Sequence, residues 1–517
     1  STKDNPTDHE LTNHEQTDRE QTDSEQGERP MSEQGDYAAE TQSESAPEPR
    51  TPLAAGSQQK GPLPAAAAVA IEDILPVNAR LFSEHRWLEY FARLRAEDPV
   101  HFNETDIAGR FWSLTRYEDI KRVDTDWKNF SSAHGIVLGF PVGADLPEGM
   151  LNMSTFIAMD PPTHDVQRKT VAGSVSPSNL GNMEALIRER TCTVLDALPE
   201  GETFDWVETV SIELTTMMLA TLFDFPFEDR RKLTRWSDIT FAIPQPGGII
   251  ESVEQRRDEL LECLEYFQRL KAERLKNPGH DLVSMMAHGK DTKDLSPMEY
   301  LGNLLLLIVG GNDTTRNTMS GSVYSLSKFP DEFTKLKANP SLIPQMVAEV
   351  IRWQTPLAYM RRTANHDIEI GGKQIKKNDQ ILMWYASGNR DDAVFKDPDR
   401  LDIERPNARQ HLSFGFGIHR CMGNRLAELQ LRILWEELLQ RFDKIEVQAE
   451  PERTFSSFVN GYTHMPVKVT RKVGPSFLVR GRPCPGPLTA SSCRAGAPRN
   501  LLTASVVSPV ASAWRRR

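Results

Sequence analysis

The spacing of hydrophobic residues divides the middle of the chain into helices and a few strands. Apolar side chains recur at helical spacing in long segments, whereas short alternating or apolar runs bounded by turn residues mark the strands. The predicted helices are 87–94, 187–198, 211–223, 256–275 and 297–319, and the predicted strands are 111–115, 368–370, 373–375 and 380–384. We therefore predict a mainly α fold with a minor β component.

The two ends of the sequence differ from this middle. Residues 1–70 are polar and acidic, with a five-residue unit repeated between Thr7 and Gln26. They have almost none of the large apolar side chains that offset the entropy of ordering. Residues 473–517 are rich in Pro, Gly, Ser and Ala and contain basic but no acidic residues. We expect a disordered acidic extension over 1–70, one domain over 71–472 and a disordered basic tail over 473–517.

Composition and charge narrow the class of protein. Hydrophobic residues make up 38% of the chain and the formal net charge is −12, which argues against nucleic acid as the main partner. Five cysteines without metal-ligand spacing suit a reducing compartment. No apolar run approaches the ~20 residues that a bilayer requires, and we find no signal-peptide pattern. We expect a cytoplasmic protein without a transmembrane segment.

The chemistry concentrates around one cysteine. Phe414, Gly417, Cys421 and Gly423 form the pattern F-x-x-G-x-x-x-C-x-G, directly before a helical pattern. The two glycines allow tight turns and close approach of a flat cofactor, and the start of the following helix favours a thiolate at Cys421. Phe414 is placed to keep water from the sulfur. Such a thiolate is a haem-iron ligand. The alternative is a buried, inert cysteine.

A second group of residues interrupts the predicted helix 297–319. Two adjacent glycines, Gly310 and Gly311, each cost roughly 1 kcal/mol relative to alanine inside a helix. Their presence is explained if a ligand lies against the backbone there. Thr314 then presents a hydroxyl toward that ligand, with Asp313 beside it as a proton source. The alternative is that Asp313 is a solvated helix residue and Thr314 bonds within its own turn.

The Cys421 pattern resembles the haem-binding signature of cytochromes P450, and Asp313–Thr314 resembles the acid–alcohol pair of the helix over the haem in that family. The resemblance covers about residues 71–472. It implies the P450 fold, with a large helical domain and a small β-rich region, and a haem b cofactor that uses dioxygen. In the family the threonine organises hydrogen bonds around the dioxygen and the acid controls the supply of protons.

The resemblance also implies roles for charged residues. Glu349 and Arg352 match the family's E-x-x-R pair, and Arg405 is the arginine expected to bind that pair and hold the cysteine loop. His164 and Arg168 match a H-x-x-x-R motif. Together with Arg361 and His419 they are expected to bind the haem propionates, since arginine suits a carboxylate well.

Four segments are especially similar to bacterial P450s that hydroxylate the terminal carbon of alkanes and, in some members, of fatty acids or primary alcohols. These segments are 305–317, 349–362, 383–391 and 419–437. The substrate expected from this similarity is a medium-chain n-alkane in a narrow apolar pocket. The candidate lining residues are Ile136, Val137, Leu138, Val309, Gly310, Leu357, Ala358, Phe458 and Val459; the alternative for each is ordinary core.

The chain has no flavin or nicotinamide fingerprint, so electrons must come from other proteins. The resemblance implies delivery from NADH through a ferredoxin reductase and a ferredoxin, which would dock on the cysteine-side face at Arg420 and Arg425. Three alternatives stay open: a peroxygenase that uses hydrogen peroxide, a monooxygenase acting on a terpenoid or steroid, and a haem-binding sensor or carrier without turnover. The acid–alcohol pair argues against the peroxygenase and the sensor.

Overall fold

The computed structural model describes residues 61–146 and 150–472, so the expected extension up to residue 60 and the expected tail from residue 473 lie outside the described residues. The folded region begins earlier than residue 71. Leu63 and Ala66 are buried, and the Tyr90 hydroxyl donates a hydrogen bond to Pro64 O at 2.7 Å. This part of the domain was missed because its contacts come from small alanines and backbone carbonyls, which produce no hydrophobic periodicity.

Most of the described chain is helical, as the sequence predicted. The predicted helices are all present, although α10 extends nine residues further than expected, to Lys328. The α-helices are Ala79–Ser83 (α1), Trp87–Glu97 (α2), Tyr117–Thr125 (α3), Thr163–Ala172 (α4), Pro177–Asp196 (α5), Glu213–Phe223 (α6), Arg231–Phe241 (α7), Val253–Arg274 (α8), Leu282–His288 (α9), Pro297–Lys328 (α10), Pro330–Ala338 (α11), Ile343–Gln354 (α12), Tyr385–Gly388 (α13) and Asn424–Arg441 (α14). A short π-helix, Val207–Ile212, leads into α6.

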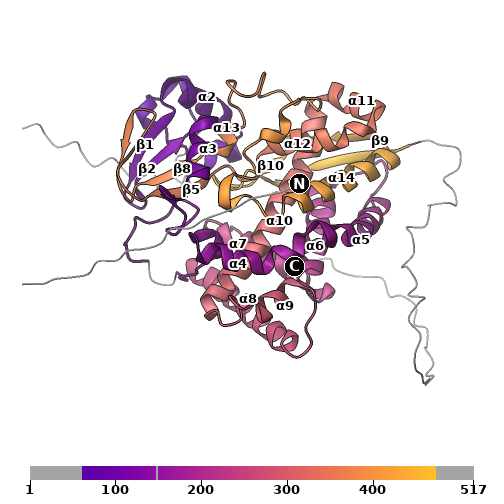
Figure 1. Cartoon of the computed structure of the whole chain (residues 1–517). Coiled ribbons are helices and arrows are strands. Elements are labelled where there is room, and N and C mark those ends of the chain that lie inside the picture. Colours follow the sequence, from indigo (N-terminus) through magenta and orange to yellow (C-terminus); the bar gives the residue numbers. More distant parts are fainter. Residues whose placement is uncertain (1–60, 147–149, 473–517) are drawn as a thin grey trace, which may run out of the picture. The chain divides into compact units, whose positions relative to one another are not determined.

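The strands of the described residues form four sheets. The largest has the order β1-β2-β8-β5-β3 and lies with α2, α3 and α13 on one side of the long helix α10 (Figure 1). The other sheets are β4-β12-β9 and the pairs β6-β7 and β10-β11. The strands are Val100–Thr105 (β1), Gly109–Leu114 (β2), Phe130–Ser131 (β3), Thr203–Asp205 (β4), Met360–Ala364 (β5), Ile368–Ile370 (β6), Lys373–Ile375 (β7), Gln380–Met383 (β8), Phe442–Val447 (β9), Glu452–Arg453 (β10), Tyr462–His464 (β11) and Pro466–Arg471 (β12).

The long helix α10 organises the helical part. Its first turn has a capping box, in which Ser296 and Glu299 each bind the other's backbone, and Pro297 occupies the first helical position. Buried residues follow along nearly its whole length, and its two halves belong to different apolar clusters: Leu304 and Ile308 to one, Met319 and Val323 to the other. The helix therefore connects the two main parts of the core.

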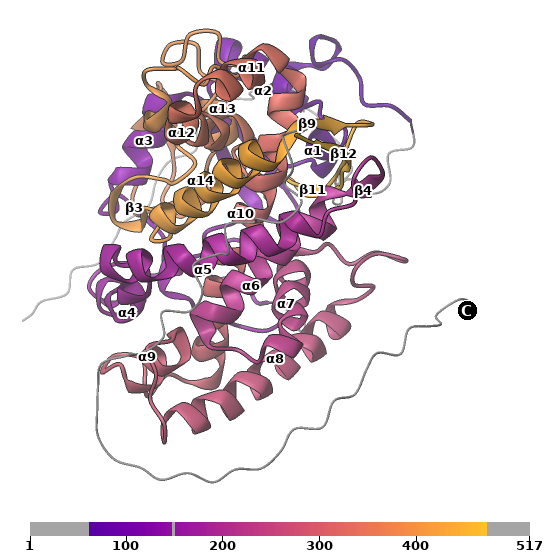
Figure 2. The same cartoon turned by 90° about the vertical axis from the view of Figure 1, so that its right-hand side faces the viewer.

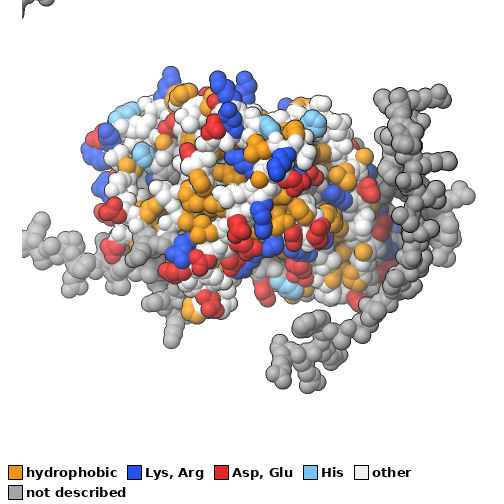
Figure 3. Space-filling model, turned by 90° about the horizontal axis from the view of Figure 1, so that it is seen from below, with side chains coloured by type: hydrophobic (Ala, Val, Ile, Leu, Met, Phe, Trp, Pro, Cys, Tyr) orange, Lys and Arg blue, Asp and Glu red, His pale blue; other side chains and the backbone are white. Residues whose placement is uncertain are grey.

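Ion pairs join the outer helices. α14 runs beside α5 (Figure 2), and Arg188 of α5 pairs with Glu436 and Glu437 of α14, both at 2.6 Å. α7 is joined to α8 in the same way, by Arg235 and Glu259 at 2.6 Å. Figure 3 shows the face that includes α8 and α9, where basic and acidic side chains lie interspersed with apolar ones. This mixture provides no continuous basic surface on that face for a nucleic acid.

A buried charge cluster fixes the segment that leads to Cys421. Arg352 donates to both carboxylate oxygens of Glu349, at 2.8 and 2.7 Å, and Arg405 Nε lies 3.0 Å from Glu349 Oε1. The side chains of Glu349 and Arg352 are 0% exposed and that of Arg405 is 4% exposed. Arg352 also donates to the carbonyls of Asn389 and Pro398, at 2.7 and 2.8 Å. The sequence-predicted Glu349, Arg352 and Arg405 thus lie together, and they hold the chain between α13 and the cysteine loop.

Replacement of Glu349 by glutamine removes the one charge that neutralises two buried arginines. We expect Glu349→Gln to lower the free energy of unfolding by about 3–5 kcal/mol, measured by urea denaturation, because an unpaired buried charge is costly. Glu184→Gln is the matched control, since Glu184 is 40% exposed in its pair with Arg188. A surface pair contributes at most about 1 kcal/mol. Equal losses in the two variants would contradict this account.

Candidate cofactor site around Cys421

The loop before Cys421 has the backbone that its glycines predict. Gly415 and Gly417 have φ values of +63° and +66°, a region that other residues rarely adopt. A Cβ on Gly417 would lie 2.7 Å from the backbone oxygen of Asp124, so only glycine fits against α3 there. The Cys421 N–H donates to Phe414 O at 2.8 Å, which closes the loop. The position of a Cβ on Gly423, in contrast, has no atom within 4 Å and borders open space.

Opposing effects act on the Cys421 thiol. The Cys421 side chain is exposed in the described structure, yet the protein atoms packed around it raise the pKa of the thiol above its usual value by desolvation. The N–H groups of Gly423 and Asn424 and the charges of Arg168 and Arg420 lower the pKa. The donors that the sequence predicted are therefore present, but desolvation of the thiol outweighs their effect in the protein alone. A bound metal cation deprotonates a coordinating thiol outright.

Histidine and arginine side chains converge beside Cys421. The rings of His164 and His419 lie 4.3 Å apart between centroids, and Arg168, one helical turn after His164, donates to Arg420 O at 2.5 Å. Burial and the nearby positive charges lower the pKa of His419 to about 2, so this ring is neutral. Nε2 of His164 and both ring nitrogens of His419 are buried without a hydrogen-bond partner.

These atoms provide the test of fit for haem. Buried polar groups are nearly always hydrogen-bonded, so unpaired nitrogens gathered beside a cysteine indicate a group that brings acceptors to them. The carboxylates of a haem bound through Cys421 supply such acceptors. Within the described residues no set of three or more His, Cys, Asp or Glu side chains is placed to hold a metal ion. The residues present therefore fit a cofactor that brings its own metal and needs one cysteine ligand.

The structure brings Arg362, the neighbour of the sequence-predicted Arg361, to this group. Successive side chains of β5 point to opposite faces of the strand. Arg362 is the cation with the largest effect on the His419 pKa, whereas the Arg361 guanidinium donates to Val137 O at 3.2 Å. The family resemblance implied Arg361, and the sequence alone does not show which of the two adjacent arginines faces this group. No contact in the described structure joins Arg361 to His164, Arg168 or His419.

A buried aspartate that the sequence did not single out holds both this arginine and the cysteine loop. Asp124, the penultimate residue of α3, accepts hydrogen bonds from Arg362 at 2.7 Å, Tyr385 OH at 2.9 Å and Phe416 N at 2.7 Å. Asn389 supports the loop from the other side, through Leu412 N at 2.7 Å. Neither residue has a local pattern that could have revealed it, since their partners lie far away in the sequence.

On α10, the two adjacent glycines have different surroundings. A Cβ at Gly310 would have no atom within 4 Å, whereas one at Gly311 would lie 2.8 Å from Leu219 Cδ2 on α6. Gly310 thus borders open space in an otherwise buried helix, and Gly311 permits close helix packing. The Thr314 hydroxyl donates to Gly310 O at 3.0 Å, and α10 stays α-helical through this region. Val309 is buried, and Asp313, next to Thr314, is 4% exposed.

An apolar cluster gathers most of the predicted substrate residues. Val137, Leu138, Leu357, Ala358, Phe458 and Val459 belong to it, together with Phe241 at the end of α7, which the sequence analysis missed. Their segments are joined by the Leu357–Val459 bridge and by Ala358 N donating to Phe458 O at 2.8 Å. Ala358 is fully buried and belongs to the wall behind the others. Val309 and Gly310 are not members of this cluster.

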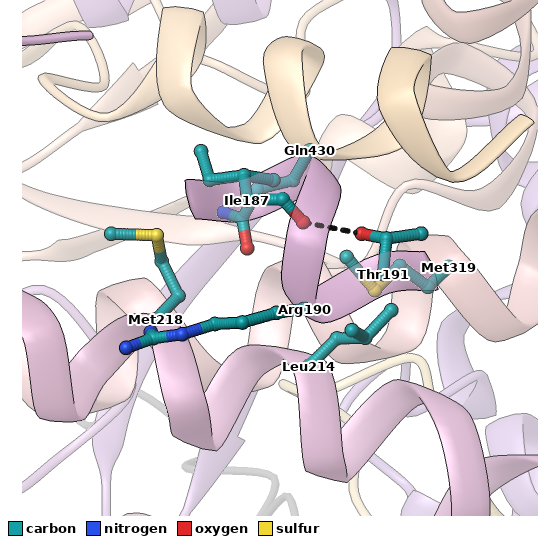
Figure 4. A pocket seen from close by; sticks show the side chains of 7 residues that line it. All are labelled: Ile187, Arg190, Thr191, Leu214, Met218, Met319 and Gln430. Carbon is teal, nitrogen blue, oxygen red and sulfur yellow. Dashed lines mark hydrogen bonds between the residues drawn. The ribbon is translucent and has the colours of Figure 1, made fainter. Parts of the chain in front are cut away.

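Two hollows lie elsewhere. A groove on the outer side of the cysteine loop is lined by α3 and the segments around Arg409 and Phe414, and includes Lys121 and Arg420. A smaller pocket lies between α5, α6, α10 and α14, with Gln430, Arg190 and Met218 in its lining (Figure 4). None of the sequence-predicted substrate residues lines either hollow. Among the described helices, none is long and apolar enough to cross a bilayer.

Comparisons with known proteins agree with this site. The family model described as Cytochrome P450 matches residues 110–466. The linalool 8-monooxygenase of Pseudomonas putida is 36% identical over 402 residues, covering 76% of this chain and 98% of the relative. The methyl-branched lipid omega-hydroxylase of Mycobacterium tuberculosis is 29% identical over 390 residues, covering 73% of this chain and 90% of the relative.

Solved structures give the same result. Cytochrome P450-153 from Novosphingobium aromaticivorans is 46% identical with a TM-score of 0.71, and CYP153D17 from Sphingomonas sp. PAMC 26605 is 48% identical with a TM-score of 0.73. Each comparison covers 77% of this chain and 99% of the other. The folded part of this protein has the P450 architecture, and the chain belongs to the cytochrome P450 family of haem-thiolate monooxygenases.

Proposed function

We propose that this P450 hydroxylates the terminal carbon of medium-chain n-alkanes, and of similar linear molecules such as fatty acids or primary alcohols. The observation that carries the proposal is the apolar cluster, in which residues 137–138, 357–358 and 458–459 and the end of α7 meet. Apolar walls suit a substrate without polar groups. Two relatives named for oxidising lipids or terpenoids, the methyl-branched lipid omega-hydroxylase and the linalool 8-monooxygenase, support an apolar substrate.

The reaction would consume dioxygen, a pair of electrons and a pair of protons, and yield an alcohol and water. Haem bound through Cys421 supplies the oxygen chemistry, since a thiolate ligand favours O–O cleavage. His164, Arg168, His419 and Arg362 would hold the propionates. The chain's own contribution to the chemical step is to orient one end of the substrate, to exclude water and to deliver protons through Asp313 and Thr314.

We further propose that the electrons come from NADH through a ferredoxin reductase and a ferredoxin. The groove beside the cysteine loop is lined by Lys121, Arg409 and Arg420, with one acid, Glu118. Such a basic groove fits an acidic protein and would speed its association. It supports docking at the sequence-predicted Arg420; Arg425 is not among the residues that line the groove.

A second candidate substrate class is terpenoid, because the 36% identical relative is named a linalool monooxygenase. The apolar walls of the cluster suit a terpenoid as well as an alkane. A linear alkane needs a narrower pocket than a branched terpenoid does. Comparison of n-alkanes with linalool as substrates decides between the two.

The central test is an absorption spectrum of the haem-loaded protein, reduced in the presence of carbon monoxide. We expect the red-shifted Soret band of thiolate ligation, and loss of this band in Cys421→Ala. Titration of the ferric protein with n-alkanes and with linalool should give a high-spin shift for medium-chain alkanes and a terminal alcohol as product. A high-spin shift and product with linalool alone would refute the alkane proposal, while an unshifted Soret band would refute ligation by Cys421.

The two glycines of α10 offer a matched pair of variants. Gly310→Ala should raise the free energy of unfolding by about 1 kcal/mol, because alanine favours helix and open space surrounds the new methyl group. The same methyl group should weaken the alkane-induced spin shift, because it enters the space that we assign to substrate. Gly311→Ala should leave substrate binding unchanged. It should not raise the free energy of unfolding, because the close contact of the new methyl group with Leu219 offsets the higher helix propensity of alanine. Unchanged alkane binding in Gly310→Ala would remove Gly310 from the substrate site.

A further inference from the structure

Arg316, one turn after Asp313 on α10, is bound by carboxylates from two helices. Its Nη1 donates to Asp238 Oδ1 of α7 at 2.8 Å, and its Nη2 donates to Asp313 Oδ1 at 3.1 Å. The side chain of Arg316 is 11% exposed, that of Asp313 5% and that of Asp238 23%. One buried cation therefore neutralises two acids, only one of which belongs to the acid–alcohol pair.

The donors around Asp313 leave a defined place for a proton. Ser237 Oγ, Asn312 Nδ2 and Arg316 Nη2 all donate to the same oxygen, Oδ1, at 2.9, 3.0 and 3.1 Å. An oxygen that accepts three hydrogen bonds is a poor site for a further proton, so protonation falls on Oδ2. In the proposed reaction a proton would leave from Oδ2, and a proton taken up at the same oxygen would restore the carboxyl.

The charge that Arg316 shares sets how readily Asp313 holds this proton. Burial raises the pKa of Asp313, Arg316 lowers it, and the charge of Asp238 raises it. If Asp238 withdrew or lost its charge, the whole of Arg316 would act on Asp313 and stabilise the carboxylate. Asp313 would then carry a proton less often at a given pH.

The position of α7 connects this charge balance to the substrate. Ser237 and Asp238, which both take part in the cluster, lie on α7, and Phe241 at the end of α7 packs against Phe458 with ring centroids 5.0 Å apart. The same helix thus contacts the apolar cluster at one end and the proton-donating acid near its centre. Any change in α7 docking would therefore reach Asp313 through Asp238 and Arg316.

We propose that Asp238 is a positioning residue for proton delivery: by sharing Arg316 it keeps Asp313 able to donate a proton when α7 is docked over the substrate. The inference rests on the proposed monooxygenase function and on the role of Asp313 within it. The alternative is that the Asp238–Arg316 pair only fastens α7 to α10. The two explanations predict different ratios of peroxide released to alcohol formed.

The experiment compares Asp238→Asn with Glu259→Gln in the haem-loaded enzyme with its electron donors and an n-alkane. Both variants remove a carboxylate that ties α7 through an arginine, but Glu259 binds Arg235 at 2.6 Å and not Arg316. Amide hydrogen exchange over residues 231–241 should rise in both. The ratio of peroxide released to alcohol formed should rise in Asp238→Asn by roughly tenfold for each unit by which the Asp313 pKa falls, and should stay at the wild-type value in Glu259→Gln.

A pH profile provides the second readout. The charged groups that act on Arg316 are Asp313 on α10, Asp238 on α7 and Glu208 on the π-helix. Loss of the Asp238 charge lowers the Asp313 pKa, so the pH above which peroxide release rises should move downward in Asp238→Asn. In an Asp313→Asn background the same substitution should have no further effect on the ratio, since no titrating group is left for Asp238 to influence.

The outcomes separate the inference from the proposed function. Any of three outcomes would overturn the role of Asp238. The first is an equal rise in peroxide release in Glu259→Gln, and the second is an effect of Asp238→Asn that persists in the Asp313→Asn background. The third is a variant Asp238→Asn with unchanged hydrogen exchange and an unchanged ratio of peroxide to alcohol. Unchanged coupling in Asp313→Asn itself would instead overturn the proposed role of the acid–alcohol pair.

Discussion

The charge of Glu349 is shared by two arginines at a depth that water does not reach. Removing Glu349 leaves two buried arginines without a counter-charge, so the carboxylate holds both arginines in place. Arg352 also donates to the carbonyls of residues 389 and 398. The side chain of Asn389 in turn accepts a hydrogen bond from Leu412 N, at the start of the cysteine loop. Polar groups fastened to α12 therefore help to set the position of Cys421, beside the apolar packing of Leu412 and Phe416.

The same arrangement recurs on the other side of the loop and on α10. Asp124 gathers Arg362, Tyr385 and the Phe416 N–H, and Arg316 gathers Asp313 and Asp238. In each case one buried charge fixes elements that are distant in sequence. The difference lies in balance: Glu349 is one acid between two bases, whereas Arg316 is one base between two acids, and only the latter leaves a carboxyl that can carry a proton.

Residues with local spacing could be predicted from the sequence. The turn at Gly417, the Glu349–Arg352 ion pair and the β6–β7 hairpin each occupy a short window whose backbone requirement is visible in the residue types. The roles of Asp313 and Thr314 stay predictions. Arg362 and Asp124 could not be predicted, because their roles arise from strand facing and from contacts across more than two hundred residues. Helix α7 was missed although it is amphipathic, and residues 61–70 were missed because alanines and carbonyls give no periodic signal.

The largest sheet joins distant parts of the chain. β2 pairs with β8 in parallel, with Phe111 opposite Gln380 and Leu114 opposite Met383, and β3 reaches the same sheet only through β5. During synthesis, β1 and β2 leave the ribosome long before their partner strands exist, and a lone hairpin is marginal in water. The sheet, and the part of the apolar cluster to which Leu382 and Trp384 belong, therefore assemble late. Long-range pairing of this kind slows folding and exposes the early strands meanwhile to other unfinished chains.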